Sequence, residues 1–149
     1  MEWKIKRFDQ LSRLELYDIL KAREEIFILE QECFYDDIDT KDIEAIHLFA
    51  GEENHVICYL RILDKGVRFN EVSIGRVLTR PAYRGQGYGE QMMRKAIDYI
   101  EKEMGEDKIR ISAQTYLKEF YENVGFQVVS KAYLEDGIDH WEMLYHSVR

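Results

Sequence analysis

The sequence predicts a single α/β domain of the α+β kind, with a mixed, mostly antiparallel central sheet flanked by helices. Three observations support this fold class. Short runs that alternate like strands are interspersed with runs of helical periodicity. A glycine cluster stands between a strand-like run and a helix-like run. The chain has 149 residues and one proline, without repeats or linkers, so we expect residues 1–149 to form one domain.

The first third of the chain is expected to hold one strand and one long helix. Residues 3–8 alternate like a strand, and Ser12 with Glu15 forms the S-x-x-E capping box that begins a helix. This helix should run to about Leu29, and an irregular acidic segment, 30–42, should follow. The buried face of the helix should comprise Leu16, Ile19, Leu20, Ile26 and Phe27.

Three antiparallel strands and a second helix should come next. Residues 46–50 and 56–63 flank a polar turn at 52–54, as in a hairpin, and residues 71–79 alternate like a third strand. After Pro81, apolar residues recur every three or four positions, as in an amphipathic helix packed on a sheet. Its buried face should comprise Tyr88, Met92, Met93, Ala96, Ile97 and Ile100.

The last third should add a strand, a helix and a hairpin. Residues 108–113 are typical of a strand, and the apolar spacing within 117–124 indicates a helix. We expect Gly125 to end this helix in a left-handed conformation. Residues 126–134 and 138–145 should form the final hairpin.

Composition and charge exclude several classes of function. Hydrophobic residues make up 46% and charged residues 34%, as in globular domains, and no apolar run approaches the roughly 18 residues of a membrane span. The net charge of -8 opposes binding to nucleic acid or to an anionic membrane. Residues 1–7 do not resemble a signal peptide, so we expect a cytoplasmic protein. No metal-binding spacing is present, and a homodimer is left open.

The most specific motif is Arg84-Gly85-Gln86-Gly87-Tyr88-Gly89, which lies between a predicted strand and helix. Glycines at this place let backbone N–H groups approach a phosphate, and the helix dipole adds attraction for an anion. The spacing differs from both G-x-G-x-x-G and the P-loop motif G-x-x-x-x-G-K-[ST]. A plain glycine turn is the alternative interpretation. The motif predicts a loop that binds a small anionic ligand.

This motif resembles [RQ]-x-x-G-x-[GA] of the GNAT superfamily, which binds the pyrophosphate of acetyl-CoA. Residues 120–126, FYENVGF, resemble its second signature, and residues 23–39 and 135–140 resemble its ElaA-like branch. The resemblance implies a GNAT fold and an acetyl-CoA-dependent N-acyltransferase that transfers an acetyl group directly to a primary amine. Gln114 stands where the family often has asparagine. The implied cofactor-binding residues are Val77, Leu78, Thr79, Arg84, Gly85, Gln86, Gly87, Tyr88, Gly89, Gln114 and Tyr121.

The resemblance also implies that Tyr121 is the general acid, since a phenol can protonate a departing thiolate at neutral pH. A core aromatic residue is the alternative interpretation of Tyr121. The general base stays open, and a solvated carboxylate or a structural histidine is the competing interpretation of each candidate. The candidates are Glu30, His140, Glu71 and the pair Asp37 and Asp39.

The acceptor is expected to be small, and the acidic segment 30–42 favours a cationic one. Whether it is a metabolite or a protein amine stays open. Asp37 and Asp39 are candidate substrate contacts. Arg23 either binds an acceptor carboxylate or pairs with a carboxylate such as Glu30 or Asp39. A non-catalytic acyl-CoA-binding module is the alternative function. A different acyl donor, or a reaction like that of homoserine-lactone synthases, which residues 23–27 resemble faintly, is a third.

Overall fold

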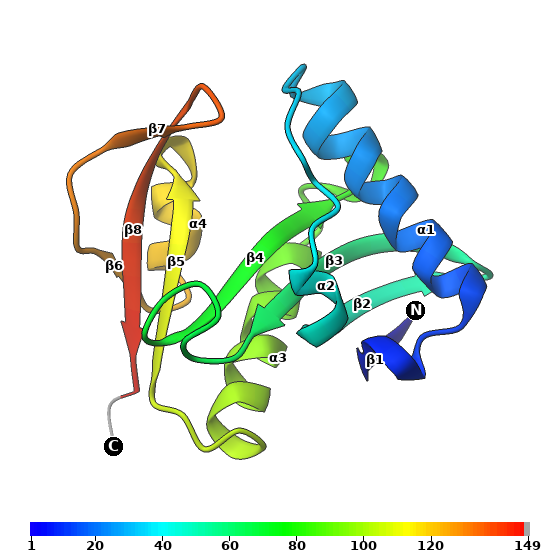
Figure 1. Cartoon of the computed structure of the whole chain (residues 1–149), viewed down its shortest axis with the longest axis horizontal. Coiled ribbons are helices and arrows are strands. Elements are labelled where there is room, and N and C mark those ends of the chain that lie inside the picture. The colour runs from blue at the N-terminus through cyan, green and yellow to red at the C-terminus, as the bar shows by residue number, and fades with distance from the viewer. Residues whose placement is uncertain (148–149) are drawn as a thin grey trace.

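The computed structural model describes residues 1–147 and confirms the predicted fold class. The strands form one sheet in the order β1-β2-β3-β4-β5-β8-β6, with β7 also paired to β8 (Figure 1). Of the strand pairs in the described residues, β4–β5 alone is parallel. The strands are β1 (Glu2–Arg7), β2 (Ile46–Glu52), β3 (His55–Leu63), β4 (Val72–Thr79), β5 (Lys108–Gln114), β6 (Phe126–Val128), β7 (Tyr133–Glu135) and β8 (Ile138–His146).

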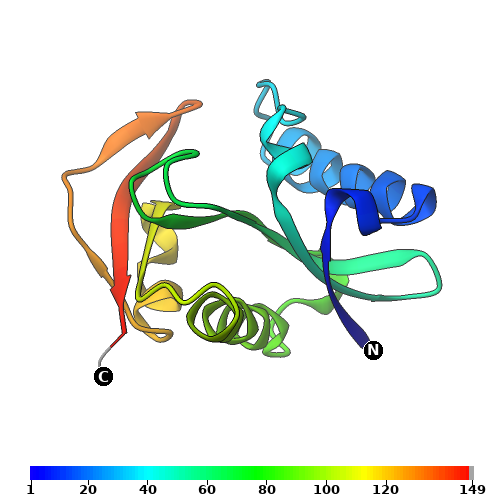
Figure 2. The same cartoon turned by 60° about the horizontal axis from the view of Figure 1, so that its bottom comes forward.

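The two long helices cover opposite faces of the sheet, as Figure 2 shows for α1 and α3. The first predicted helix has the expected extent, but its second half is a π-helical segment, η2, that follows α1 directly. The helices are α1 (Arg13–Arg23), η2 (Glu24–Glu30), α2 (Lys41–Glu44), α3 (Tyr88–Lys102) and α4 (Lys118–Glu122). Single 3-10 turns are η1 (Phe8–Gln10), η3 (Pro81–Tyr83) and η4 (Thr115–Leu117).

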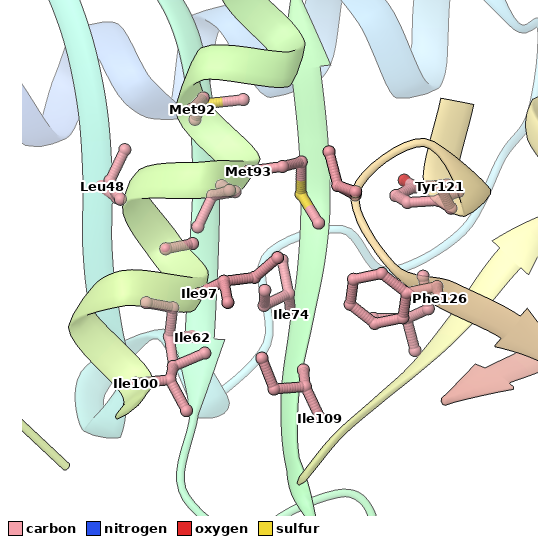
Figure 3. Packing of buried hydrophobic residues seen from close by; sticks show 14 of the residues in the cluster. Leu48, Ile62, Ile74, Met92, Met93, Ile97, Ile100, Ile109, Tyr121 and Phe126 are labelled. Atoms are coloured by element: carbon pink, nitrogen blue, oxygen red, sulfur yellow. The ribbon is translucent and has the colours of Figure 1, made fainter. Parts of the chain in front are cut away.

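Alternation along the strands divides the core between the two faces of the sheet. Leu48 and Leu60 pack in the cluster beneath α3, whereas Phe49 and Tyr59 pack with Ile19 beneath α1. Figure 3 shows the α3 side of the core. The residues of α3 that the structure buries, Met92, Met93, Ala96, Ile97 and Ile100, were all predicted. On the first helix, Ile19 and Ile26 are buried, and Leu16, Leu20 and Phe27 are partly buried.

The final hairpin differs from the prediction in one respect. The expected strand 126–134 is interrupted after Val128, because the Ser130 hydroxyl accepts the Glu142 N–H (2.8 Å) in place of a backbone carbonyl. The turn itself is as predicted. Asp136 and Gly137 have φ of 52° and 77°, which suits the two-residue turn of a tight hairpin.

The predicted capping box at the start of α1 is present and carries additional charge interactions. The Glu15 N–H donates to Ser12 Oγ (3.0 Å), and the Ser12 N–H donates to Glu15 Oε1 (2.8 Å). Lys4 Nζ and Lys6 Nζ of β1 lie 2.9 and 3.0 Å from the same carboxylate. Glu15 therefore joins the first strand to the first helix.

Glu15→Gln should lower the free energy of unfolding by about 1–2 kcal/mol at pH 7, because the capping box survives but the charge is lost. Burial opposes ionisation, yet hydrogen bonds from Ser12, Lys4 and Lys6 lower the pKa of Glu15 from 4.5 to about 2. The carboxylate therefore stabilises the fold above about pH 4.5, and this contribution disappears as the pH falls towards 2. Urea unfolding of the wild type and Glu15→Gln between about pH 4.5 and 2 should show the difference in free energy of unfolding shrinking as the pH falls. A difference that does not change with pH would contradict the stabilising role of the Glu15 charge.

Candidate active site

A cavity opens where β4 and β5 separate. Their parallel pairing comprises Val72 with Ile109 and Ser73 with Arg110, after which the two strands diverge (Figure 1). Strand β5 continues along β8 as far as Gln114, while the facing edge of β4 has no strand partner in the described residues. The cavity between them has a volume of about 610 Å³, within the range of small-molecule and cofactor sites. Strand β4, η2, α3, α4 and the β7–β8 hairpin contribute to its lining.

A bulge in β4 lies beside this cavity. Tyr59 pairs with Leu78 but Arg61 pairs with Gly75, so β4 has one more residue than β3 across this interval. Arg76 has φ of 54°, and the simple alternation predicted for β4 stops there. Bulges redirect side chains and end regular pairing, and they are frequent next to active sites.

The predicted anion loop lines the cavity at the start of α3. Gly85 and Gly87 have φ of 77° and 85°, and a Cβ at either position would meet no described atom within 4 Å. Gly87 is also the N-cap of α3, so the first N–H groups of the helix have no side-chain cap. An open, glycine-lined helix N-terminus fits a diphosphate. Gln86 lies outside the cavity lining, and its amide donates to the Ala82 carbonyl (3.4 Å).

Gly89 has a different role from the other glycines of the motif. A Cβ at Gly89 would lie 3.3 Å from two atoms of the Phe120 ring, closer than ordinary contact. The glycine therefore lets α3 and α4 approach each other. Tyr88 and Gly89 both line the cavity.

Arg84 lines the cavity but is engaged by Glu30 of η2. Its Nη2 and Nη1 lie 2.7 and 3.0 Å from the two Glu30 carboxylate oxygens, and its Nε donates to the Thr79 carbonyl (2.8 Å). Both side chains are partly exposed. Glu30 faces the cavity as predicted, but a carboxylate held by a guanidinium is poorly placed to accept a proton.

Tyr121 lies at the wall that α4 contributes to the cavity. It is 6% exposed and packs edge-on against Phe120, with ring centroids 5.0 Å apart, and against Phe126, at 6.1 Å. Its hydroxyl makes no hydrogen bond within residues 1–147. Burial raises the pKa of Tyr121, so the phenol keeps its proton at physiological pH. Tyr121 is thus a packed core residue that keeps its proton and also lines the cavity.

His140 lines the opposite part of the cavity, on the β7–β8 hairpin. Its Nδ1 lies 2.7 Å from the Ile138 carbonyl oxygen, which can only accept, so Nδ1 carries the proton. Neutral His140 then has its lone pair on Nε2, which lies 3.6 Å from Glu135 Oε2. An imidazole held in one tautomer beside a carboxylate is an arrangement suited to a general base.

Glu135 was not predicted as a site residue. It lines the cavity, and its Oε1 accepts hydrogen bonds from Arg68 Nη2 (2.7 Å) and Ser112 Oγ (3.2 Å). A signal did exist in the sequence. Since residues 136–137 form a two-residue turn, the pairing places Glu135 and His140 on the same face of the hairpin.

The predicted substrate contacts Arg23, Asp37 and Asp39 lie outside the cavity lining and require a correction. Arg23 is fully buried, and it pairs with Asp37 (2.9 Å) and Asp42 (2.7 Å) rather than with Glu30 or Asp39. Asp39 pairs with Arg61 through both oxygens (2.6 and 2.9 Å). These ion pairs occupy the groups that an acceptor would need, so their role is structural.

Of two further candidate site residues, Glu71 lies outside the cavity lining and Gln114 lies within it. Glu71 pairs with Arg110, at 3.0 Å to each carboxylate oxygen, away from the main cavity. Gln114 lines the cavity, and its Nε2 donates to Gln31 Oε1 (3.4 Å).

Within the described part of the chain, no cluster of His, Cys, Asp or Glu could hold a metal ion. No helix of residues 1–147 has the length and apolar character to cross a membrane.

The separated β4–β5 pair, the bulge and the glycine-capped helix together form a cavity with a free strand edge beside an anion-binding loop. The family model described as "Acetyltransferase (GNAT) domain" matches residues 17–146. A UPF0039 protein of Synechocystis sp. is 35% identical over 146 residues, which cover 97% of this chain and 95% of that protein. The chain therefore belongs to the GNAT acetyltransferase family.

Two crystal structures agree with this assignment. That of an acyl-CoA N-acyltransferase from Pseudomonas aeruginosa has a TM-score of 0.90 and 35% identity, covering 97% of this chain and 99% of that one. That of Escherichia coli ElaA has a TM-score of 0.90 and 33% identity, covering 98% and 100%. The chain thus has the GNAT fold and lies in the ElaA-like branch of the family.

Proposed function

We propose that this protein transfers the acetyl group of acetyl-CoA directly to a primary amine of a small acceptor. One observation carries the proposal. A single cavity is lined by the phosphate loop, by the protonated phenol of Tyr121 and by the imidazole of His140. A non-catalytic acyl-CoA-binding module would need the loop, but it would have no use for an acid and a base on the same cavity.

The donor half of the cavity fits acetyl-CoA. The open cradle at Gly85 and Gly87, together with the start of α3, would hold the diphosphate. The free backbone edge of β4 at Val77 and Thr79 would pair with the pantetheine arm, and a free N–H of this edge would polarise the thioester carbonyl. The predicted contact Leu78 is corrected, because its N–H faces β3: the Arg80 N–H, two residues further on, donates to the Ile57 carbonyl (2.8 Å). When bound, acetyl-CoA supplies that electrophilic carbonyl and a thiolate leaving group. The amide of Gln114 and the guanidinium of Arg84 also lie on this cavity.

Proton movements complete the reaction. His140 Nε2 would take a proton from the acceptor ammonium, directly or through water, and Glu135 Oε2, 3.6 Å away, would stabilise the imidazolium. The resulting amine forms the C–N bond as the C–S bond breaks, and Tyr121 would protonate the departing sulfur. The second proton lost by the amine nitrogen would pass through water to the Tyr121 phenolate, and His140 would release its proton to solvent. We therefore favour His140 over Glu30 as the base.

Gly87→Glu tests the donor site. A carboxylate at the head of α3 should lower acetyl-CoA affinity by about 10- to 50-fold in calorimetry, through repulsion of the phosphates. Gly87→Gln is the matched control, because it has nearly the same bulk and the same left-handed backbone strain without the charge. Gly66→Glu places the same charge at φ of 87° in the β3–β4 loop. If Gly87→Glu and Gly87→Gln bind acetyl-CoA equally well, the loop is not the phosphate site.

A further inference from the structure

The acceptor end of the cavity is lined by an ion pair that leaves groups of both signs free. Arg68 Nη2 donates to Glu135 Oε1 (2.7 Å), and the two side chains are 30% and 33% exposed. A guanidinium has five N–H donors, and this hydrogen bond is the one that Arg68 makes within the described residues. The guanidinium carbon also lies 5.0 Å from the centroid of the Phe69 ring, a cation–π contact that helps to hold the side chain in place. Arg68 can therefore bind an anion without leaving Glu135.

Only one oxygen of the Glu135 carboxylate accepts hydrogen bonds within the described residues. Its Oε1 accepts from Arg68 and Ser112, whereas Oε2 faces His140 Nε2 at 3.6 Å, beyond hydrogen-bonding distance. Because Nδ1 of His140 holds the proton, Oε2 and Nε2 are two acceptors that face each other. An ammonium group supplies donors to both.

The charge balance of the cavity argues against a polycationic acceptor. Within the acidic segment that the sequence suggested as an attractant, Asp37, Asp39 and Asp42 all pair with arginines. Of the carboxylates that line the cavity, Glu30 is held by Arg84, Glu90 by Arg94 and Glu135 by Arg68, and within residues 1–147 Asp136 alone faces no guanidinium. A site in which most carboxylates are paired with a guanidinium suits a ligand that carries both signs better than a polycation.

We propose that the acceptor is a small zwitterion with the carboxylate one carbon from the amine, as in an α-amino acid. Its ammonium binds between Glu135 Oε2 and His140 Nε2, and its carboxylate binds the free N–H groups of Arg68. Arg68 and His140 lie next to the two different oxygens of the Glu135 carboxylate. The carboxylate and the ammonium of the ligand must therefore lie close together. This inference rests on the proposed function and names the substrate class of the same site.

The test compares α-amino acids with their carboxamides and their decarboxylated amines as acceptors, with coenzyme A release as the readout. The amino acid should have a KM at least tenfold below that of its two analogues. Arg68→Gln should raise the KM of the amino acid about 10- to 100-fold and change kcat little, and it should change the KM of the decarboxylated amine at least tenfold less than that of the amino acid. Arg68→Lys should restore part of the loss. Arg13→Gln, which removes an exposed arginine of α1, is the control for net charge.

The outcomes separate this inference from the proposed function. If decarboxylated amines react as well as amino acids, or if Arg68→Gln affects both equally, amine acetylation stands and the zwitterion site is overturned. If no acceptor reacts, saturation-transfer NMR on the coenzyme A complex can still test whether the protein binds an amino acid. Amino-acid binding that Arg68→Gln abolishes would support the subsite without the reaction, and absence of binding to the wild-type complex would overturn it.

Discussion

Tyr121→Phe is expected to lower kcat by about 10²- to 10³-fold while acetyl-CoA affinity stays within about threefold of wild type. The substitution removes only the hydroxyl, which makes no hydrogen bond within residues 1–147, and keeps the ring packed on Phe120 and Phe126. Because burial keeps the phenol protonated, the variant loses a proton donor and little else. Coenzyme A release with an identified acceptor measures kcat, and calorimetry measures donor affinity.

Tyr17→Phe on the exposed surface of α1 is the matched control, and its kcat should equal that of wild type. A Tyr121→Phe protein with unchanged kcat would show that the residue only packs the core. A wild-type protein that binds acetyl-CoA but turns over no acceptor would favour the non-catalytic binding module.

Arg23→Met should lower the free energy of unfolding by about 3–5 kcal/mol, because it leaves buried carboxylates without their partner. Arg23 is wholly inaccessible, and its removal deprives Asp37 and Asp42 of contacts at 2.9 and 2.7 Å. Methionine retains most of the side-chain volume and the helix propensity, so the charge dominates the effect.

Urea unfolding at neutral pH measures this loss. The control is Arg94→Met, which removes an exposed pair with Glu90 on α3 and an exposed hydrogen bond to the Asn123 carbonyl (3.2 Å), and it should cost less than about 1 kcal/mol. If both variants lose the same small amount, the buried ion pairs do not anchor the acidic segment.

Local patterns explain why much of this structure could be predicted. The capping box at Ser12, the apolar spacing of α3 and the glycine motif each act within a few consecutive residues. The proposed diphosphate loop is such a stretch, at 84–89, so it could be predicted from the sequence, whereas the free edge of β4 beside it depends on how the strands pair.

The acceptor half could not be predicted in the same way, because it is assembled from distant segments. Arg68 in the β3–β4 loop meets Glu135 of β7, and nothing local in either segment indicates the other. The expectation that the acidic segment contacts the acceptor is wrong for a related reason. Asp37 and Asp39 appear free in the sequence, while their partners are contributed by α1, β3 and β4. The positive φ of Arg76 could not be predicted from the sequence either, because glycine is the usual residue at such a φ and this position is an arginine.

The free edge of β4 has a further consequence for the solubility of the protein. Strand edges that expose backbone N–H and C=O groups attract strands of other chains and promote aggregation. Here the edge lies inside a cavity of about 610 Å³ rather than at the rim of the sheet, with the next strand beyond it. The backbone groups that would promote aggregation at the rim are thus accessible only to a slender ligand, and under the proposed function the donor would complete the sheet there in place of a strand.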